Sequence, residues 1–480
     1  MYEIYRAAAK VQIWLGPDDH IQSAKVAFRS IETISDFLCQ RLGISTSDLK
    51  SSKDIYQEMV FKNREALPLP NDCEFSTVEM WKSLVWLYSH SYFTRVWVIQ
   101  ELNASKERVV RCGLESTEWE RVELVAGYII MESSFSRSFG FSKAHCWWAA
   151  IATTERIRQP DNWLCMLYLT SNFSSTDARD AIYGLLGLIK RDIEAPLSEP
   201  DYNKPTIEVY RDSVETALTT YRNTDVLLYA TGNETPSWIP RWDKPMLFRN
   251  PFRFGKTLPW RPGGNTEPAW SIDKTFNLLS LSGILVDPIE FAESYNEDCF
   301  CNTMMESSEG RSALRQLWQK ILGTVRKARP EVPFNAELLT ALAASFSFGI
   351  NDQGDSADES ILMRNFVAYL GLVLDEKTFK TYIPSEISSE TGDADGRVFG
   401  KPVWDFKYPE SSVFVTKRGL IGCSVSVTKP GDVVCAALGS TYLIILRPEV
   451  DVFVVRGYAY VHGIMCGERQ DSREIVFRIR

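Results

Sequence analysis

Apolar and polar positions alternate in two rhythms, which separate a helix-rich part of the chain from a strand-rich part. Up to about residue 374, apolar residues recur every three or four positions, which is typical of amphipathic helices. From residue 411 onwards, short apolar runs are separated by Gly, Pro or Asp, which is typical of strands and turns. We expect helices at 1–10, 20–41, 77–88, 116–131, 144–158, 162–169, 181–188, 206–221, 311–329, 336–347 and 366–374. We expect strands at 11–15, 109–112, 226–230, 278–286, 413–416, 420–421, 432–438, 441–446, 452–455 and 459–461, and loops at 349–359 and 385–396.

The most informative stretch is 92–113. Its first half has an apolar face at helical spacing, and Glu101 follows Trp97 by four positions, one helical turn later. A carboxylate beside apolar rings loses hydration, which raises its pKa and suits it to general acid/base chemistry. The alternative is structural, with Glu101 paired to Arg95 or capping nearby backbone groups. With both interpretations open, Glu101, Trp97 and Arg95 are the candidate catalytic residues.

Several motifs follow one another from the first residues to about residue 468. They are VQIWLG (Val11–Gly16), RVWVIQEL (Arg95–Leu102), DARDAIYGLLGL (Asp177–Leu188), SWIPRWD (Ser237–Asp243), and the C-terminal signature GDVVCAALGSTYLIILRP (Gly431–Pro448) with GYAYVHGIMCGE (Gly457–Glu468). In this order the motifs resemble those of the fungal heterokaryon incompatibility (HET) domain, and they cover most of the chain.

The pattern and the resemblance together imply a mixed α+β and α/β protein. We expect a HET domain at 1–190 with a TIR-like (flavodoxin-like) α/β fold, a mixed linker and helical region at 191–395, and a small β-barrel-like C-terminal domain at 396–480. HET domains normally begin with a Y-x-A-L-S-Y-x-W-G strand and a D-x-I-C-I-N-Q turn, and neither motif occurs here. The resemblance therefore predicts an N-terminally truncated domain whose strand at 11–15 is left as an edge.

The same resemblance implies a role in fungal non-self recognition and programmed cell death. The expected mechanism is that of a recognition and self-association module, which docks a protein partner or a second copy. An NAD+ hydrolase is the alternative, and an inactive, degenerate paralogue is a third possibility. Of the three, only the hydrolase would perform chemistry on a small molecule.

The alternative to a binding module is an NAD+ hydrolase. HET domains are described as similar to TIR domains, several of which cleave NAD+ with a Glu one turn after a Trp in a W-C-x-x-E helix. Residues 97–101 match that spacing, with Val98 in place of the Cys. A carboxylate near the ribose would stabilise the oxocarbenium-like state, as in glycoside hydrolysis. Because the missing strands would build half of the ligand crevice, we expect little or no NAD+ cleavage.

The charge and the Cys and His content argue against some classes of binding partner and cofactor. A formal net charge of -9 argues against sequence-independent nucleic-acid binding, which needs a basic surface. The ten Cys include no CxxC pair and the four His show no metal spacing, so neither a metal nor a cofactor is expected, and NAD+ enters only as the substrate of the alternative. We find no signal peptide and no apolar run long enough to span a membrane, so we expect a cytoplasmic location.

Three smaller groups could also carry chemistry. Asp18-Asp19 follows a strand, where cation or ribose ligands sometimes lie, although a turn with helix-capping acids is favoured. Arg179 with Asp180 could bind an anion, although a structural salt bridge with Asp180 as the cap is favoured. His462 with Glu468 could form an acid/base pair, although tight turns are the more frequent explanation of the glycines around them.

Overall fold

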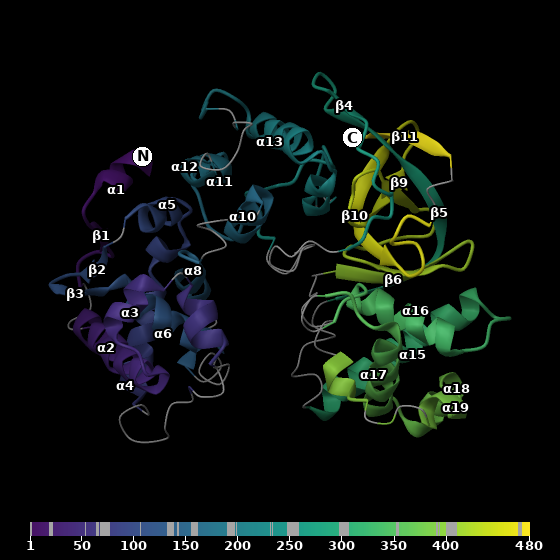
Figure 1. Ribbon diagram of the computed structural model, residues 1–480, viewed down its shortest axis with the longest axis horizontal. Helices are drawn as coiled ribbons and strands as arrows, with labels where there is room; N and C mark the ends of the chain where they lie inside the picture. Colours follow the sequence, from purple (N-terminus) through teal and green to yellow (C-terminus); the bar gives the residue numbers. More distant parts are fainter. Residues whose placement is uncertain are drawn as a thin grey trace. The chain divides into compact units, whose positions relative to one another are not determined.

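A computed structural model (Figure 1) describes residues 2–480 except 19–22, 53, 64–66, 68–76, 106, 132–138, 142–143, 155–161, 190–196, 198, 231, 233, 247–258, 297–306, 352–354, 390–391, 393, 400–409 and 469–472. The chain forms two compact units. Unit 1 consists of Met1–Tyr202 and Trp242–Pro245, and unit 2 consists of Asn203–Arg241 and Met246–Arg480. Each unit is described separately below.

Unit 1 contains a three-stranded sheet in the order β1-β2-β3. Strand β1 (Val11–Trp14) runs parallel to β2 (Arg108–Cys112), and β2 pairs antiparallel with β3 (Glu115–Glu118). The sequence prediction that a helix begins at 116 is wrong, because a turn after Cys112 reverses the chain and pairs it with β2 before the helix starts. Among the described residues, β1 has β2 as its one neighbour, which confirms that it lies at an edge.

Unit 1 also contains twelve described helical elements, of which α2 and α6 contact the sheet most. They are α1 (Tyr2–Ala7), α2 (Ser23–Leu42), α3 (Thr46–Ser51), the π-helix η1 (Ile55–Phe61), α4 (Val78–Tyr88), the 3₁₀ helix η3 (Ser91–Thr94), α5 (Trp97–Ala104), α6 (Trp119–Met131), α8 (Cys146–Ile151), α10 (Trp163–Thr170), α11 (Asp180–Tyr183) and α12 (Leu186–Ile189). Helix α2 packs against α4 and α6 with its apolar stripe buried, as its period predicts. The unit is therefore mixed α and β, and the more specific flavodoxin-like arrangement stays a prediction.

Unit 2 contains a closed six-stranded barrel. Each strand pairs antiparallel with the next in the ring β5-β6-β7-β10-β9-β8 and back to β5. The strands are β5 (Leu278–Asn296), β6 (Glu410–Thr416), β7 (Ile421–Ser424), β8 (Val433–Ala437), β9 (Leu443–Pro448) and β10 (Phe453–Val461), and β4 (Trp270–Asp273) and β11 (Glu474–Ile479) pair with β5 outside the ring. The predicted C-terminal barrel is confirmed, and its first strand comes from well before residue 396.

Helices cover one side of the barrel in unit 2 (Figure 1). They are α15 (Ser308–Ala328), α16 (Ala336–Ser347) and α17 (Glu359–Val373), followed by α18 (Glu376–Tyr382) and α19 (Ser385–Ser389), while α13 (Thr206–Tyr221) and the 3₁₀ helix η5 (Asp225–Tyr229) precede the barrel. Trp318 is fully buried and packs against the rings of Phe346, Phe366 and Tyr369, which confirms the helical middle of the chain.

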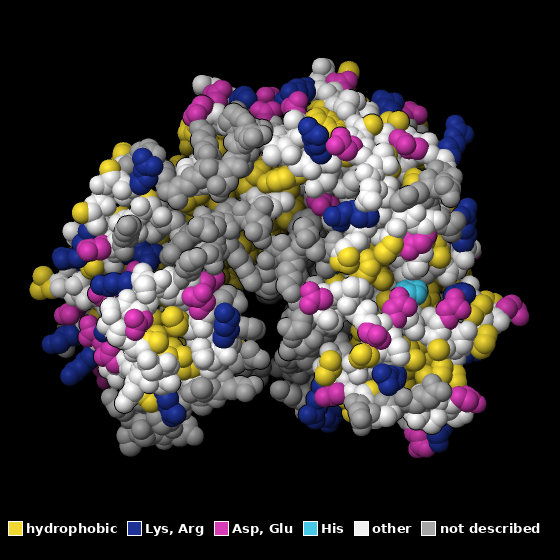
Figure 2. Space-filling model, viewed as in Figure 1, with side chains coloured by type: hydrophobic (Ala, Val, Ile, Leu, Met, Phe, Trp, Pro, Cys, Tyr) yellow, Lys and Arg dark blue, Asp and Glu magenta, His cyan; other side chains and the backbone are white. Residues whose placement is uncertain are grey.

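Two local predictions in unit 2 are wrong. Residues 226–230 were expected to form a strand but lie mostly in η5, because the segment is held by its neighbours in the barrel rather than by a strand partner. The loop expected at 385–396 includes the short helix α19. In the face shown in Figure 2, described basic and acidic side chains are intermixed rather than separated into one basic patch. Among the described residues, no helix combines the length and apolar character needed to cross a lipid bilayer.

Candidate functional site

The candidate catalytic helix, α5, begins where the chain is tied to a distant segment of unit 1. The N–H of Val96 donates to the carbonyl of Ser174 at 3.0 Å, and the N–H of Ser174 donates to the carbonyl of Thr94. This bridge ends η3 and fixes the direction in which α5 starts. Val98, Ile99 and Leu102 are then buried, while Trp97 and Glu101 lie half-buried on another face of the helix. The predicted helix and the one-turn spacing are therefore present.

The Glu101 carboxylate is held by two tyrosines. The hydroxyl of Tyr5 on α1 donates to Oε1 at 3.2 Å, and the hydroxyl of Tyr92 on η3 donates to Oε2 at 3.0 Å. Burial, and then the negative charge of Glu101 and its hydrogen bond, raise the pKa of the Tyr92 hydroxyl. The same causes raise the pKa of Tyr5. Both tyrosines therefore stay protonated donors, and each carboxylate oxygen of Glu101 has one phenol partner.

Trp97 is bound to a different segment. Its indole Nε1 donates to Asp180 Oδ2 at 3.1 Å, and the hydroxyl of Tyr202 donates to the other oxygen of Asp180 at 2.7 Å. Trp97 and Glu101 thus lie on consecutive turns of α5 but bind partners from opposite parts of the unit 1 sequence. Their hydrogen bonds fasten α5 to α1 and η3 through Glu101 and to α11 through Trp97.

Arg95 does not form an ion pair with Glu101 in the described part of unit 1. Its side chain is exposed, and its backbone forms the bridge to Ser174. Its positive charge acts on the site from a distance, as the last of the causes that shift the pKa of Tyr5 and Tyr92, and it opposes their rise. The expected guanidinium partner of Glu101 is therefore replaced by two phenol donors.

The DARD motif contains a salt bridge, but with a different acid from the one expected. Arg179 Nε and Nη2 donate to the two oxygens of Asp177 at 2.8 and 2.6 Å, and the guanidinium carbon lies 5.2 Å from the centre of the Tyr202 ring. Asp180 is free to accept from Trp97 because Arg179 turns back to Asp177, which precedes it by two residues. The predicted Arg179–Asp180 pair is wrong, since Asp180 starts α11 facing α5.

Two further contacts join α5 to this motif. Gln100 Nε2 donates to the carbonyl of Gly184, and both residues are buried. A Cβ at Gly184 would lie 3.2 Å from Val96 Cγ1 and 2.7 Å from the carbonyl oxygen of Asp180, so glycine permits this approach. The RVWVIQEL and DARDAIYG motifs, far apart in sequence, are therefore packed together. Sequence reasoning missed Tyr5, Tyr92, Gln100 and Tyr202 because nothing local marks them as partners.

Among the described residues, the less favoured acid/base pair of His462 with Glu468 is not formed, whereas Asp18 has the favoured helix-capping role. His462 Nδ1 lies 3.8 Å from Glu359 Oε1, while Glu468 accepts from the backbone N–H of Cys466 at 2.8 Å, so His462 and Glu468 are not bonded to each other. Asp18 accepts from the N–H of Ala24 at the start of α2, and Asp19 lies outside the described residues. No group of three His, Cys, Asp or Glu within the described ranges is arranged to hold a metal ion.

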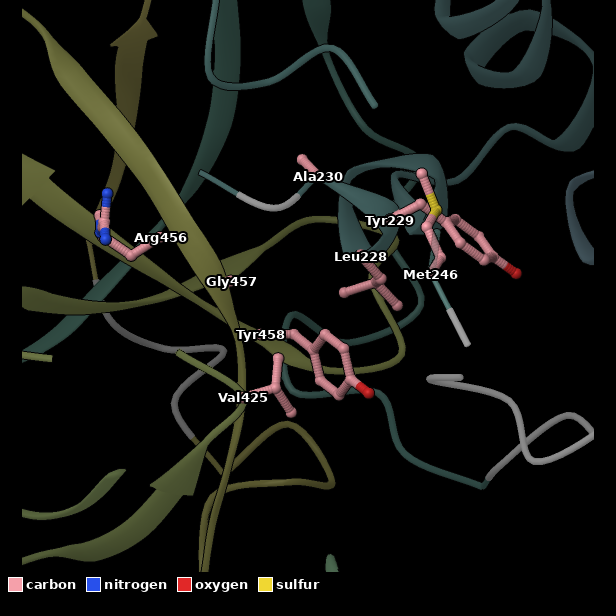
Figure 3. A pocket seen from close by; sticks show the side chains of 8 residues that line it. All are labelled: Leu228, Tyr229, Ala230, Met246, Val425, Arg456, Gly457 and Tyr458. Carbon is pink, nitrogen blue, oxygen red and sulfur yellow. The ribbon is translucent and has the colours of Figure 1, made fainter. Parts of the chain in front are cut away.

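A small cavity in unit 2 lies beside a bulge of β10. It has a volume of about 20 Å³, enough for about one water molecule, and is lined by Leu228, Val425 and Tyr458 among others. Figure 3 shows these three side chains on one side of the strand, with Arg456 on the other. Arg456 is the extra residue of the bulge, between Val455 and Gly457, and donates to the carbonyl of Gly232. The cavity is too small for a substrate.

Comparison with known proteins assigns both ends of this chain. Residues 1–101 match the family described as "Heterokaryon incompatibility protein (HET)", and residues 407–476 match the "Het-6 beta-barrel domain". The chain is a HET-domain protein. The first match ends at Glu101 and so includes α1, β1 and the Trp97–Glu101 turn, and the second includes β6 to β10 of the barrel.

A curated relative extends the similarity over nearly the whole HET-domain protein. The relative is "Heterokaryon incompatibility protein 6, OR allele" of Neurospora crassa, which is 23% identical over 99% of this chain and 78% of its own length. No solved structure matches the chain. The two family matches and this relative therefore agree with the motif-based resemblance.

Proposed function

We propose that this HET-domain protein takes part in heterokaryon incompatibility, the process for which the families and the Neurospora crassa relative are named. The support is the combination of a HET domain at one end and a Het-6 barrel at the other, together with similarity to the relative along 99% of the chain. Two matched regions in one chain are more specific than either region alone.

Within this process, we propose that the protein acts by recognition and self-association rather than by catalysis. The observation that carries the proposal is that the hydrogen-bonding groups of the candidate catalytic pair are bound within unit 1. Both oxygens of Glu101 accept phenol hydrogen bonds, and the indole nitrogen of Trp97 donates to Asp180. A carboxylate that must reach a ribose would first have to exchange these partners. The pair is better suited to fixing α5 than to hydrolysing NAD+.

The edge of β1 is the surface best suited to self-association. The N–H groups of Val11 and Leu15 donate to the strand beside them, so the backbone groups of Gln12 and Trp14 point away from β2. Gln12 is exposed and Trp14 is 57% exposed, whereas Val11 and Ile13 are buried. Two copies related by a twofold axis could add β1 to β1 at this edge, with main-chain hydrogen bonds and Trp14 supplying the contact.

The test compares two variants of the edge with one of the candidate catalytic group. Gln12→Pro removes the outward N–H while leaving the bonds to β2 intact, and Gln12→Ala is its matched control. Sedimentation velocity over a range of concentrations should show a reversible dimer for the unsubstituted protein and for Gln12→Ala. Gln12→Pro should raise the dissociation constant by about tenfold or more. A strictly monomeric protein at high concentration would overturn the self-association proposal.

The catalytic alternative is tested separately. Glu101→Gln keeps size and one carboxamide oxygen but removes charge. Growth arrest after expression in a fungal host should persist in Glu101→Gln and be lost in Gln12→Pro. Purified protein incubated with NAD+ should release no more nicotinamide than Glu101→Gln. Rapid release by the unsubstituted protein, abolished in Glu101→Gln, would replace the binding module by the hydrolase.

A further inference from the structure

A cavity of about 140 Å³ lies in unit 2 where the helices meet the barrel. Its walls come from four parts of the chain, which are the segment at Trp260 before β4, the end of α16 with the turn that follows it, the start of α17, and the end of β10 with the loop after it. The volume is well above the roughly 10–15 Å³ needed for one water molecule, so the cavity can take the head of a small organic ligand. It involves none of the residues around Glu101.

Two aromatic rings form one corner of the cavity. The centres of the Trp260 and Tyr460 rings are 5.6 Å apart at an interplanar angle of 70°, so the two rings meet edge to face. Gly349 makes this corner possible, because a Cβ there would lie 2.8 Å from the Trp260 ring and 2.6 Å from the Tyr460 ring. Its φ of +69° is a second reason for glycine at this position. Glycine thus allows the backbone to approach both rings closely.

The charged groups at the cavity are of one sign. Glu359 and Glu468 line it, and its lining among the described residues holds no Lys or Arg. Burial, and then the charge of Glu359 and the neighbouring Cys466 and Glu468, raise the pKa of the Tyr460 hydroxyl. Burial and the charge of Glu468 raise the pKa of Cys466. Burial is the larger cause of both shifts, so the case for a cation depends on the two carboxylates that line the cavity.

Two buried side-chain nitrogens of the cavity lining lack a hydrogen-bond partner among the described residues. Trp260 is 8% exposed, and its indole Nε1 has no acceptor among the described residues. His462 Nδ1 is likewise unpartnered by any hydrogen bond, with the nearest carboxylate oxygen, that of Glu359, 3.8 Å away. A buried polar group without a partner costs free energy. The Nδ1 of a neutral His462 can accept an N–H of a ligand. The indole N–H of Trp260 is a donor and needs an acceptor that a cation does not supply, such as an ordered water.

We propose that this cavity is a binding site for an organic cation, an alkylammonium or guanidinium group. The two carboxylates would accept its N–H groups, and the faces of Trp260 and Tyr460 would contact its charge through cation–π interaction. Such a group could be a free amine or the side chain of an Arg or Lys on a protein. The chemistry at the cavity is the same in both cases, and the experiment separates the two sources.

The experiment titrates the full-length protein by calorimetry with three probes. Agmatine represents the free cation, acetyl-Gly-Arg-Gly-amide represents the side chain, and acetyl-Gly-Gln-Gly-amide is the uncharged control. At least one cationic probe should bind with a saturable isotherm, and the Gln peptide should not bind. Agmatine alone would identify a small-molecule site, and the Arg peptide alone would identify a protein partner. No binding by either cation at millimolar concentration would overturn the proposal.

Variants show whether the binding occurs in the cavity. The double variant Glu359→Gln/Glu468→Gln removes both charges while keeping size, and it should weaken binding by about tenfold or more. Glu337→Gln, an exposed acid at the start of α16 outside the cavity, is the matched control and should bind as the unsubstituted protein does. Trp260→Leu should also weaken the binding, and circular dichroism would confirm that each variant is folded. Equal affinity in the double variant and in Glu337→Gln would exclude the cavity.

Discussion

At the residue scale, the spacing of Trp97 and Glu101 was predictable, and their partners were not. A helical period places Glu101 one turn after Trp97, and the structure agrees. The phenol of Tyr5 lies 96 positions before Glu101, and Asp180 lies 83 positions after Trp97. Such partners are chosen by the packing of elements distant in sequence, which one sequence does not reveal. The chemistry of a residue was therefore easier to predict than its environment.

Replacing Tyr92 or Glu101 should lower the free energy of unfolding by different amounts, because the two residues form a hydrogen bond. Tyr92→Phe deletes one hydrogen bond and should reduce the free energy of unfolding by about 1 kcal/mol. Glu101→Ala should cost about 2–3 kcal/mol, because it leaves the hydroxyl of the buried Tyr92 without an acceptor. Urea unfolding followed by circular dichroism measures both, with Tyr5→Phe as the more exposed comparison. A Glu101→Ala protein as stable as the unsubstituted one would show that the hydrogen bonds from Tyr5 and Tyr92 to Glu101 do not contribute to stability.

Two acidic residues on α6 also have surroundings that the local sequence does not predict. Acidic side chains are usually exposed, yet Glu120 and Glu123 are 2% and 1% exposed. Glu120 accepts from Arg108 of β2 at 2.6 Å, and Glu123 accepts from the indole of Trp119 at 3.1 Å. The two side chains are buried because β3 comes directly before α6 in the chain and packs the helix against β2 and β3. A local sequence pattern contains no information about this packing.

At the scale of elements, β10 and η5 show why some predicted strands differ from the structure. The sequence predicts two strands at 452–455 and 459–461, but the structure has one strand with a bulge at Arg456, where Gly457 adopts a φ of +146°. The apolar run at 226–230 has strand composition but lies mostly in a 3₁₀ helix. Its first residue, Asp225, accepts from both the N–H and the hydroxyl of Thr441, between β8 and β9. Tertiary hydrogen bonds thus override the local preference.

The burial of the Asp225 carboxyl group should make the stability of unit 2 depend on pH. Burial raises the pKa of Asp225 from 3.8 to about 6, while its hydrogen bonds from Thr441 and the charge of Arg261 act in the opposite direction. The folded state therefore holds a proton that the unfolded state has released. The free energy of unfolding should fall as pH rises from about 4 to about 6, by up to about 3 kcal/mol, and the loss is complete above that range.

Asp225→Asn tests this dependence because it keeps the acceptor oxygen and removes the charge. Denaturant unfolding at a series of pH values should give a flatter profile for Asp225→Asn between pH 4 and 6, and a stability at pH 7 equal to or above that of the unsubstituted protein. Asp273→Asn, on the exposed β4, is the control and should follow the unsubstituted profile. Parallel profiles for Asp225→Asn and the unsubstituted protein would contradict the assignment.

At the scale of the whole molecule, the fold class was more predictable than the way the chain is divided. The sequence indicates a C-terminal barrel, and the barrel is present, but its longest strand, β5, comes from the middle of the chain. Only 278–286 was expected as a strand, because Asp287 and Pro288 interrupt the alternation there. The structure continues β5 through two register shifts beside these residues. Asp287 and Pro288 would be expected to end a strand, but pairing within the closed barrel continues β5 past them.

Two units with separate cores should unfold in two steps. Trp119 in unit 1 and Trp318 in unit 2 are both fully buried, so replacing either with Leu leaves a cavity and should cost roughly 3 kcal/mol. In differential scanning calorimetry, Trp119→Leu should lower the midpoint of one transition and Trp318→Leu the midpoint of the other, each by several degrees. If both substitutions instead lower one common transition, the units unfold as one cooperative body, and the division at Tyr202 describes packing density and not thermodynamics.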